Sequence, residues 1–195
     1  MKFLTKNINS DIHTEGLTYL KNADNSTLRN RLLSEQKNFC AYTEKYVQDL
    51  DSVEVEHLNA SLKYEDDYFN YYAVLRSPNL YKKDEKFKEH DFFKSLFFQN
   101  ASQFQSRIQY KNGIYYETNE NDFEARDLIE FLGFNHPSLS KQRTNHLSRL
   151  KSIFKGFNDV EKQTYFKFHR EELSFITALE VEFIDLNFSK ILDLV

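Results

Sequence analysis

The sequence of 195 residues contains very little cysteine, glycine or proline, and these shortages exclude several classes of protein. A single cysteine, Cys40, excludes a disulfide framework and an all-cysteine zinc site within one chain. With four glycines, two prolines and neither glycine-rich fingerprint, a Rossmann or P-loop nucleotide site is not expected. No apolar run is as long as a membrane span, and the first residues, MKFLTKNINSD, lack the apolar stretch of a secretory signal. We therefore expect a cytoplasmic protein that contacts no membrane.

Apolar residues are plentiful by contrast: 40% of the chain is hydrophobic and 16% is aromatic, which is enough to bury a core. The length suits one domain, and we find no internal repeat or low-complexity linker. We therefore expect residues 1–195 to form a single α+β domain, with helices concentrated towards the C-terminus. The formal net charge is −4, whereas a free duplex-DNA binder is usually more basic. Any nucleic-acid role would need local basic patches or a partner that supplies them.

Charge is distributed unevenly along the chain. Residues 41–75 hold eight acids and two lysines, whereas residues 76–111 hold eight basic and four acidic residues. Residues 139–170 are again basic, and residues 171–195 are acidic. An acidic segment followed by a basic one suits a metal site beside a polyanion site, and ordinary solvated surface is the alternative.

The hydrophobic pattern of the first half predicts alternating elements. In order, these are a helix over 26–38, strands over 39–47 and 52–58, a loop over 59–69, a strand over 71–75, and a helix from Ser77 to about 88. Asp49-Leu50-Asp51 is expected to join the first two strands as a hairpin. Ser77 followed by Pro78 is typical of a helix start, so Asn79 falls in the first helical turn.

The second half predicts a hairpin over 104–118, helices over 122–132 and 138–155, and helices from Asn158 onwards. Asn112-Gly113 is a strong hairpin signal, and Asn158 with Glu161 has the spacing of a capping box. The acidic last helix carries a long apolar face from Leu173 to Ile191. That face either packs on the core or docks a partner.

Four polar residues recur at a recognisable spacing. Glu56-His57 ends a predicted strand, Asn70 follows 13 positions after His57, and Asn79 follows nine after that. A carboxylate–histidine pair, then Asn, then Asn at this spacing resembles the HNH nuclease motif, the ββα-metal finger. The layout is similar to the HNH domain of RNA-guided CRISPR nucleases.

A closer resemblance covers about residues 25–150. The segments FCAYTEKYV, VEHL, NYYAVLRSPNLYKK, FQSRIQYKNGIYYE and ARDLIEFLGFNHPSLSKQR, in this order, resemble the PtuB-type HNH endonucleases of Septu and retron-linked anti-phage systems. This resemblance implies a nuclease subunit in prokaryotic defence that works with a PtuA-type ATPase of the ABC/SMC kind. It also implies an HNH core over about 39–88 and a helical and hairpin accessory part over about 89–195. DNA is the expected target, and RNA is the alternative.

The resemblance assigns roles to the four residues. In an HNH site a single Mg²⁺ or Mn²⁺ ion neutralises charge on the scissile phosphate and the leaving oxygen. Glu56 and Asn79 are the expected metal ligands, and neutral His57 is the expected base that takes a proton from water. Asn70 is expected to bond loop backbone, hold the finger closed and position His57. The structural alternatives are a solvated carboxylate, a satisfied histidine and an ordinary polar residue in a first helical turn.

The sequence departs from the PtuB-like pattern at the zinc site. Those proteins often carry two C-x-x-C pairs, whereas Cys40 and Thr43 stand at the first pair here and Leu75 and Pro78 at the second. A structural zinc and its ribbon are therefore not expected, and apolar packing is expected in their place. The candidates for that packing are Phe39, Tyr42, Leu75 and Tyr81.

Basic residues on and after the predicted finger helix, and one arginine further along, are the expected nucleic-acid contacts: Lys82, Lys83, Lys86 and Arg143. Solvated surface is the alternative for the lysines. Arg143 falls inside the apolar stripe of the helix over 138–155, so a structural ion pair is its alternative. Two functions follow from this sequence: an active nuclease subunit, or a catalytically inactive HNH-fold binding or scaffold subunit of the same kind of complex.

Overall fold

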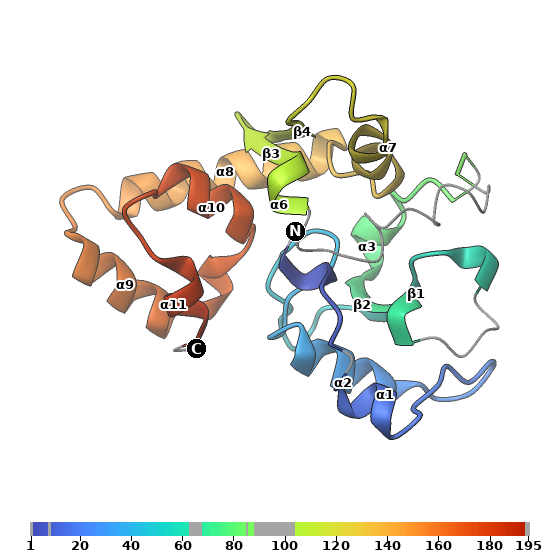
Figure 1. Cartoon of the computed structure of the whole chain (residues 1–195). Helices are drawn as coiled ribbons and strands as arrows, with labels where there is room; N and C mark the ends of the chain where they lie inside the picture. The colour runs from blue at the N-terminus through green and yellow to red at the C-terminus, as the bar shows by residue number, and fades with distance from the viewer. Residues whose placement is uncertain (1, 8, 63–67, 85, 88–103, 194–195) are drawn as a thin grey trace.

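The structure, a computed structural model, describes residues 2–7, 9–62, 68–84, 86–87 and 104–193 (Figure 1). Its helices are α1 (Asp11–Thr14), α2 (Ser26–Glu35), α3 (Arg76–Asn79), α6 (Phe104–Arg107), α7 (Phe123–Phe131), α8 (Pro137–Ile153), α9 (Asp159–Phe168), α10 (Ile176–Glu182) and α11 (Phe188–Asp193). Short 3₁₀ turns are η1 (Lys2–Leu4), η2 (Ala60–Leu62), η3 (Tyr68–Asn70) and η5 (Arg170–Leu173). The strands β1 (Val53–His57) and β2 (Tyr71–Leu75) form one antiparallel sheet, and β3 (Ile108–Lys111) and β4 (Ile114–Glu117) form another. The α+β class is therefore confirmed.

The two small sheets have different neighbours: α2 contacts β1 and β2, whereas α7 contacts β4 and α10 contacts β3. In Figure 1, α1 and α2 lie at the β1–β2 end of the molecule, and α8 to α11 gather at the opposite end. Among the residues that the structure describes, no helix is long and apolar enough to cross a membrane.

The first sheet pairs strands differently from the sequence expectation. β1 pairs with β2, in a register that places Val53 opposite Leu75 and His57 opposite Tyr71. The expected hairpin between residues 39–47 and 52–58 is wrong. Residues 39–47 instead fold back on themselves, with a single bridge between Phe39 and Tyr46.

Glu44 explains that turn. Its backbone is left-handed, with φ 57°, and its amide donates to the carbonyl of Cys40 at 2.9 Å. Its buried carboxylate accepts the hydroxyl of Thr177 at 2.7 Å and the backbone N–H of Lys2 at 2.9 Å. These contacts hold a polar turn where the pattern predicted a strand.

The finger helix is much shorter than expected. α3 covers only Arg76–Asn79, and the chain leaves it because the N–H of Lys83 donates to the carbonyl of Phe131, at the end of α7, at 2.8 Å. The predicted helix to residue 88 is therefore wrong beyond Asn79, and its residues 85 and 88 lie outside the described part of the chain.

Elements with strong local signals formed as predicted. The Asn112-Gly113 turn has both φ angles positive, at 51° and 91°, and joins β3 to β4. Asn158 and Glu161 form the capping box of α9. Two expectations were wrong: residues 104–107 are helical rather than extended, and the expected last helix is divided into η5, α10 and α11. The division follows Phe175, which adopts a left-handed backbone just before α10.

The apolar face predicted at the C-terminus packs into the main hydrophobic core. The members of this face that pack on the core, and do not dock a partner, are Leu173, Ile176, Leu179, Leu186 and Ile191. The same core contains Phe39, Tyr42 and Leu75, the candidates for replacing zinc by packing. The sulfur of Cys40 is buried and accepts the backbone N–H of Leu75 at 3.3 Å. Tyr81 lies elsewhere, stacked on His136.

Candidate metal centre on the first hairpin

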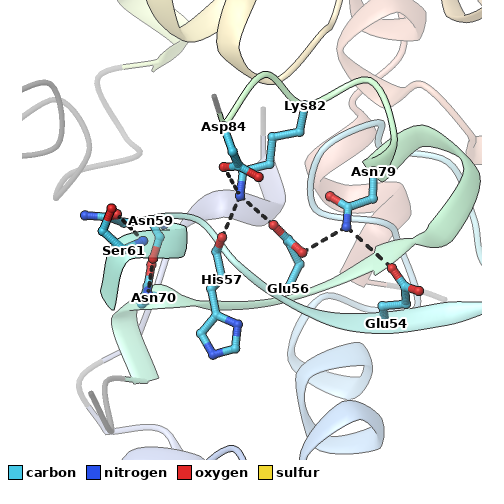
Figure 2. Close-up of polar contacts among 9 residues, drawn as sticks. All are labelled: Glu54, Glu56, His57, Asn59, Ser61, Asn70, Asn79, Lys82 and Asp84. Atoms are coloured by element: carbon cyan, nitrogen blue, oxygen red, sulfur yellow. Dashed lines mark hydrogen bonds and ion pairs between the residues drawn. The ribbon is translucent and has the colours of Figure 1, made fainter. Parts of the chain in front are cut away.

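One face of β1 carries two carboxylates. Side chains alternate along a strand, so Glu54 and Glu56 share a face. Asn79, at the end of α3, lies over them: its Nδ2 donates to Glu56 Oε2 at 2.8 Å and approaches Glu54 Oε2 at 3.5 Å (Figure 2). The two expected metal ligands, 23 positions apart in sequence, are therefore in direct contact.

Lys82 completes this cluster from the segment after α3 (Figure 2). Its Nζ lies 2.5 Å from Glu56 Oε1, 2.9 Å from Asp84 Oδ1 and 2.6 Å from the carbonyl oxygen of His57. The side chain is only 2% exposed, whereas that of Glu56 is 17% exposed. Lys82 is thus an internal counter-ion of the carboxylates, and the expectation of a surface phosphate contact needs correction.

The donor set suits a hard divalent cation. Asn79 Oδ1 is buried and accepts no hydrogen bond from the described residues, so an amide oxygen is available beside the two carboxylates. Carboxylate and amide oxygens are the ligands preferred by Mg²⁺ and Mn²⁺. The described residues contain no group of three or more His, Cys, Asp and Glu side chains placed to hold a metal. Glu54, Glu56 and Asn79 are the oxygen-bearing side chains that this face of the hairpin brings together.

His57 points to the other face of the hairpin (Figure 2). Its ring makes edge contacts with Tyr19, at 4.9 Å between centroids, and with Tyr71, at 5.1 Å. The residue is 9% exposed, although a base at a strand end is expected to be open to solvent. Tyr19 comes from the loop between α1 and α2, and its ring packs at an angle of 82° to that of the histidine. In this arrangement His57 does not face the Glu56–Asn79 pair.

Asn70 closes the loop that follows His57. Its Oδ1 accepts the backbone N–H of Asn59 at 2.7 Å, and its Nδ2 donates to the carbonyl of Asn59 at 3.0 Å. Both residues are buried. Asn70 therefore bonds loop backbone next to His57, at the place where the resemblance expects a closing contact.

The other predicted basic residues lie apart from this cluster. Lys83 and Lys86 are exposed and both pair with Glu130, at 2.9 and 2.5 Å. Arg143 is 1% exposed and donates to the carbonyls of Gly113, at 2.9 Å, and Phe134, at 2.7 Å. Burial lowers the pKa of Arg143. A surface nucleic-acid contact at Arg143 is therefore corrected to a structural role, with carbonyl partners rather than the alternative ion pair.

Sequence reasoning missed several neighbours of the site. Asp84 and Asn59 carried no motif, although both lie close in sequence to residues that did. Tyr42 was expected only as packing, but it lies near Glu56: burial first, and then the charge of Glu56, raise the pKa of Tyr42 well above its ordinary value. Its hydroxyl is buried and has no hydrogen-bond partner among the described residues. No sequence signal pointed to Tyr19 as a neighbour of His57.

Comparisons of the chain with protein families, with curated proteins and with solved structures found no significant match. The geometry of the β1–β2 hairpin and the resemblance of its motif therefore remain the indications of function.

Proposed function

We propose that this chain is a metal-dependent nuclease subunit of the HNH type that acts in prokaryotic anti-phage defence with an ATPase partner. The observation that carries the proposal is the contact between Glu56 and Asn79 on a strand–strand–helix unit. Asn70 supports it, because it closes the loop at the end of β1 in the same unit. The proposed substrate is DNA, and the proposed metal is Mg²⁺ or Mn²⁺.

Glu56, Asn79 and Glu54 would hold the metal, and the metal would supply charge neutralisation at the scissile phosphate. Lys82 holds the Glu56 side chain in place, because its ammonium group is bonded to that carboxylate. Asn70 fixes the backbone at Asn59, two positions after His57. A neutral His57 would hold the proton taken from the attacking water. That role requires the Tyr19 loop to move, because Tyr19 now packs against the ring.

A partner follows from the charge of the chain. At a net charge of −4 the isolated chain can neutralise few phosphates. Each phosphate contact adds only about 0.9 to the slope of log affinity against log salt concentration. A PtuA-like ATPase of the ABC/SMC type would supply a basic channel and hold DNA near the hairpin. The apolar face of residues 173–191, which the sequence offered as a docking surface, is largely used by the core. The basic helix α8 still presents exposed residues such as Lys141 and Lys151.

The test is metal-dependent nicking of plasmid DNA by the complex with its ATPase and by the lone chain. We expect strong cleavage in the complex with Mn²⁺ or Mg²⁺ and much weaker cleavage by the lone chain. Glu56→Gln and His57→Ala should each abolish it. Glu180→Gln is the control, because Glu180 is a carboxylate on α10 that pairs with Lys2. Wild-type cleavage by both site variants would overturn the proposal.

A second function is favoured by a specific observation. His57 is packed between two tyrosines and Glu56 already has a cationic partner, which suits a catalytically inactive binding or scaffold subunit. In that case the chain would form a stable complex with the ATPase on gel filtration, yet no divalent metal would produce cleavage. Cleavage that is lost in His57→Ala would exclude this second function.

A further inference from the structure

A cavity of about 500 Å³ lies between the segment after α3, the end of α7 and the start of α8. Its walls include Tyr81, Ile129, His136 and Pro137, with charged side chains among the lining residues. Cavities of this volume, with aromatic walls and a few polar groups, are typical of small-ligand sites. Neither the HNH motif nor the proposed metal centre makes use of it.

A stacked ring pair forms one wall of this cavity. Tyr81 and His136 lie face to face, with centroids 3.6 Å apart and planes within 8° of parallel. The His136 ring is held by the backbone N–H of Ser138, which donates to its Nδ1 at 3.3 Å. The Tyr81 backbone is held against Gly133, where an added Cβ would lie 2.5 Å from the Tyr81 carbonyl oxygen. This stacked pair, the Tyr81–His136 platform, is therefore held in place by the fold itself.

Two exposed ion pairs border the rings. Lys83 pairs with Glu130, and Arg126 pairs with Glu117; both cationic side chains are about half exposed, at 48% and 46%. Exposed ion pairs contribute little to stability, so a phosphate can take the place of either carboxylate at small cost. Flat aromatic rings beside exchangeable cations match the two halves of a nucleotide, which are a stacking base and an anionic phosphate.

We propose that this cavity binds a nucleotide, with its base against the Tyr81–His136 platform and its phosphate at Lys83 or Arg126. Tyr81 follows Asn79, a proposed metal ligand, by only two positions in the sequence. The choice of a nucleotide as ligand rests in part on the proposed function, whereas the cavity and the stack do not. A free mononucleotide and one nucleotide of a nucleic acid share this chemistry.

The test is calorimetric titration of the full chain with deoxyadenosine monophosphate in EDTA, so that no metal chemistry contributes. We expect saturable binding with a Kd between about 10 µM and 1 mM. Deoxyribose 5-phosphate, which lacks the base, should bind at least about tenfold more weakly. A tetranucleotide of deoxyadenosine that binds more tightly than the monomer would identify nucleic acid as the source, and equal affinity would identify the free nucleotide.

His136→Asn removes the ring while it keeps a residue suited to the helix N-cap. We expect it to weaken binding by about 5- to 100-fold, the range for losing one base stack. His169→Asn is the matched control, because His169 also packs on a tyrosine, Tyr165, but does not line the cavity. Tyr81→Leu gives a second readout if His136→Asn folds poorly.

Three results would overturn the proposal: no saturable binding at about 5 mM nucleotide, equal binding of the base-free sugar phosphate, or unchanged affinity in both platform variants. Because the titration contains no metal, its outcome is independent of cleavage. Nucleotide binding without DNA cleavage would refute the proposed nuclease but support this site. DNA cleavage without nucleotide binding would refute this site but support the proposed nuclease.

Discussion

Lys82 beside the β1–β2 hairpin and Arg143 beside the β3–β4 hairpin are both buried cations, with 2% of the Lys82 side chain and 1% of Arg143 exposed. Their oxygen partners differ in kind. Lys82 contacts two carboxylates and one carbonyl, whereas Arg143 contacts the carbonyls of Gly113 and Phe134 and lies 4.9 Å from the Tyr115 ring. Carbonyl oxygens are neutral, so those beside Arg143 balance little of its positive charge. Carboxylates can exchange a lysine for a metal ion, and this separates a structural hairpin from a candidate reactive one.

The largest expected effect is at Arg143. Arg143→Leu leaves the carbonyls of Gly113 and Phe134 buried without their charged donor, and should lower the free energy of unfolding by about 3 kcal/mol. Urea unfolding followed by circular dichroism measures this. Arg149→Leu is the control, since Arg149 is half exposed and its ion pair with Glu172 should contribute less than about 1 kcal/mol. A loss below about 1 kcal/mol at Arg143 would contradict the structural role.

Glu44 is a buried anion, and its carboxylate accepts hydrogen bonds from Thr177 N, Thr177 Oγ1 and Lys2 N. Burial alone would raise its pKa, but the charge of the N-terminus and these hydrogen bonds hold the pKa of Glu44 below its ordinary value of 4.5. A lowered pKa means that its stabilisation is complete above about pH 4.5 and is lost as the pH falls through the folded-state value.

Glu44→Gln should therefore lower the free energy of unfolding by about 2 kcal/mol at pH 7. The gap between wild type and variant should narrow as the pH falls below 4.5. Urea unfolding from pH 7 to pH 3 measures the gap. A gap that stays constant over this range, or widens in acid, would show that the carboxylate is not held ionised by the fold.

The same contacts show what the sequence could and could not predict about the fold. The Asn112-Gly113 turn and the capping box of Asn158 and Glu161 depend on residues a few positions apart, and both formed as predicted. The strand expected over 39–47 failed because Glu44 is fixed by Thr177, 133 positions away. A local pattern carries no information about such a distant partner.

The candidate site divides in the same way. The contact between Glu56 and Asn79 follows from a strand–strand–helix layout, which residue spacing reveals. The orientation of His57 depends on Tyr19, which belongs to a loop with no predicted element. The burial of Lys82 depends on a contact of its neighbour, because the N–H of Lys83 donates to the carbonyl of Phe131, about 48 positions away. Motif spacing therefore predicted which residues meet, but not which face they present.

An intermediate effect is expected at Lys82. Lys82→Met leaves Glu56 and Asp84 without their cation, and should destabilise the metal-free chain by about 1–2 kcal/mol. If the carboxylates can exchange lysine for metal, millimolar Mn²⁺ should then raise the Tm of the variant by about 5 °C, and more than it raises that of wild type. Lys83→Met is the control, because its pair with Glu130 is exposed. Equal Mn²⁺ responses in all three proteins would remove the distinction between the two hairpins.

The smallest effect on stability, with a separate effect on binding, is expected at Lys83 and Lys86. Both are exposed and share Glu130, so Lys83→Met and Lys86→Met should each change the free energy of unfolding by less than about 0.5 kcal/mol.

If these lysines exchange Glu130 for DNA phosphates, each substitution should reduce the slope of log affinity against log salt by about 0.9. Fluorescence anisotropy with labelled duplex DNA, on the complex with the ATPase between low and physiological salt, measures that slope. Lys162→Met is the control, because Lys162 pairs with Asp159 on α9, away from the hairpin. An unchanged slope in both variants would show that these lysines are solvated surface, and would leave the first hairpin without its expected phosphate contacts.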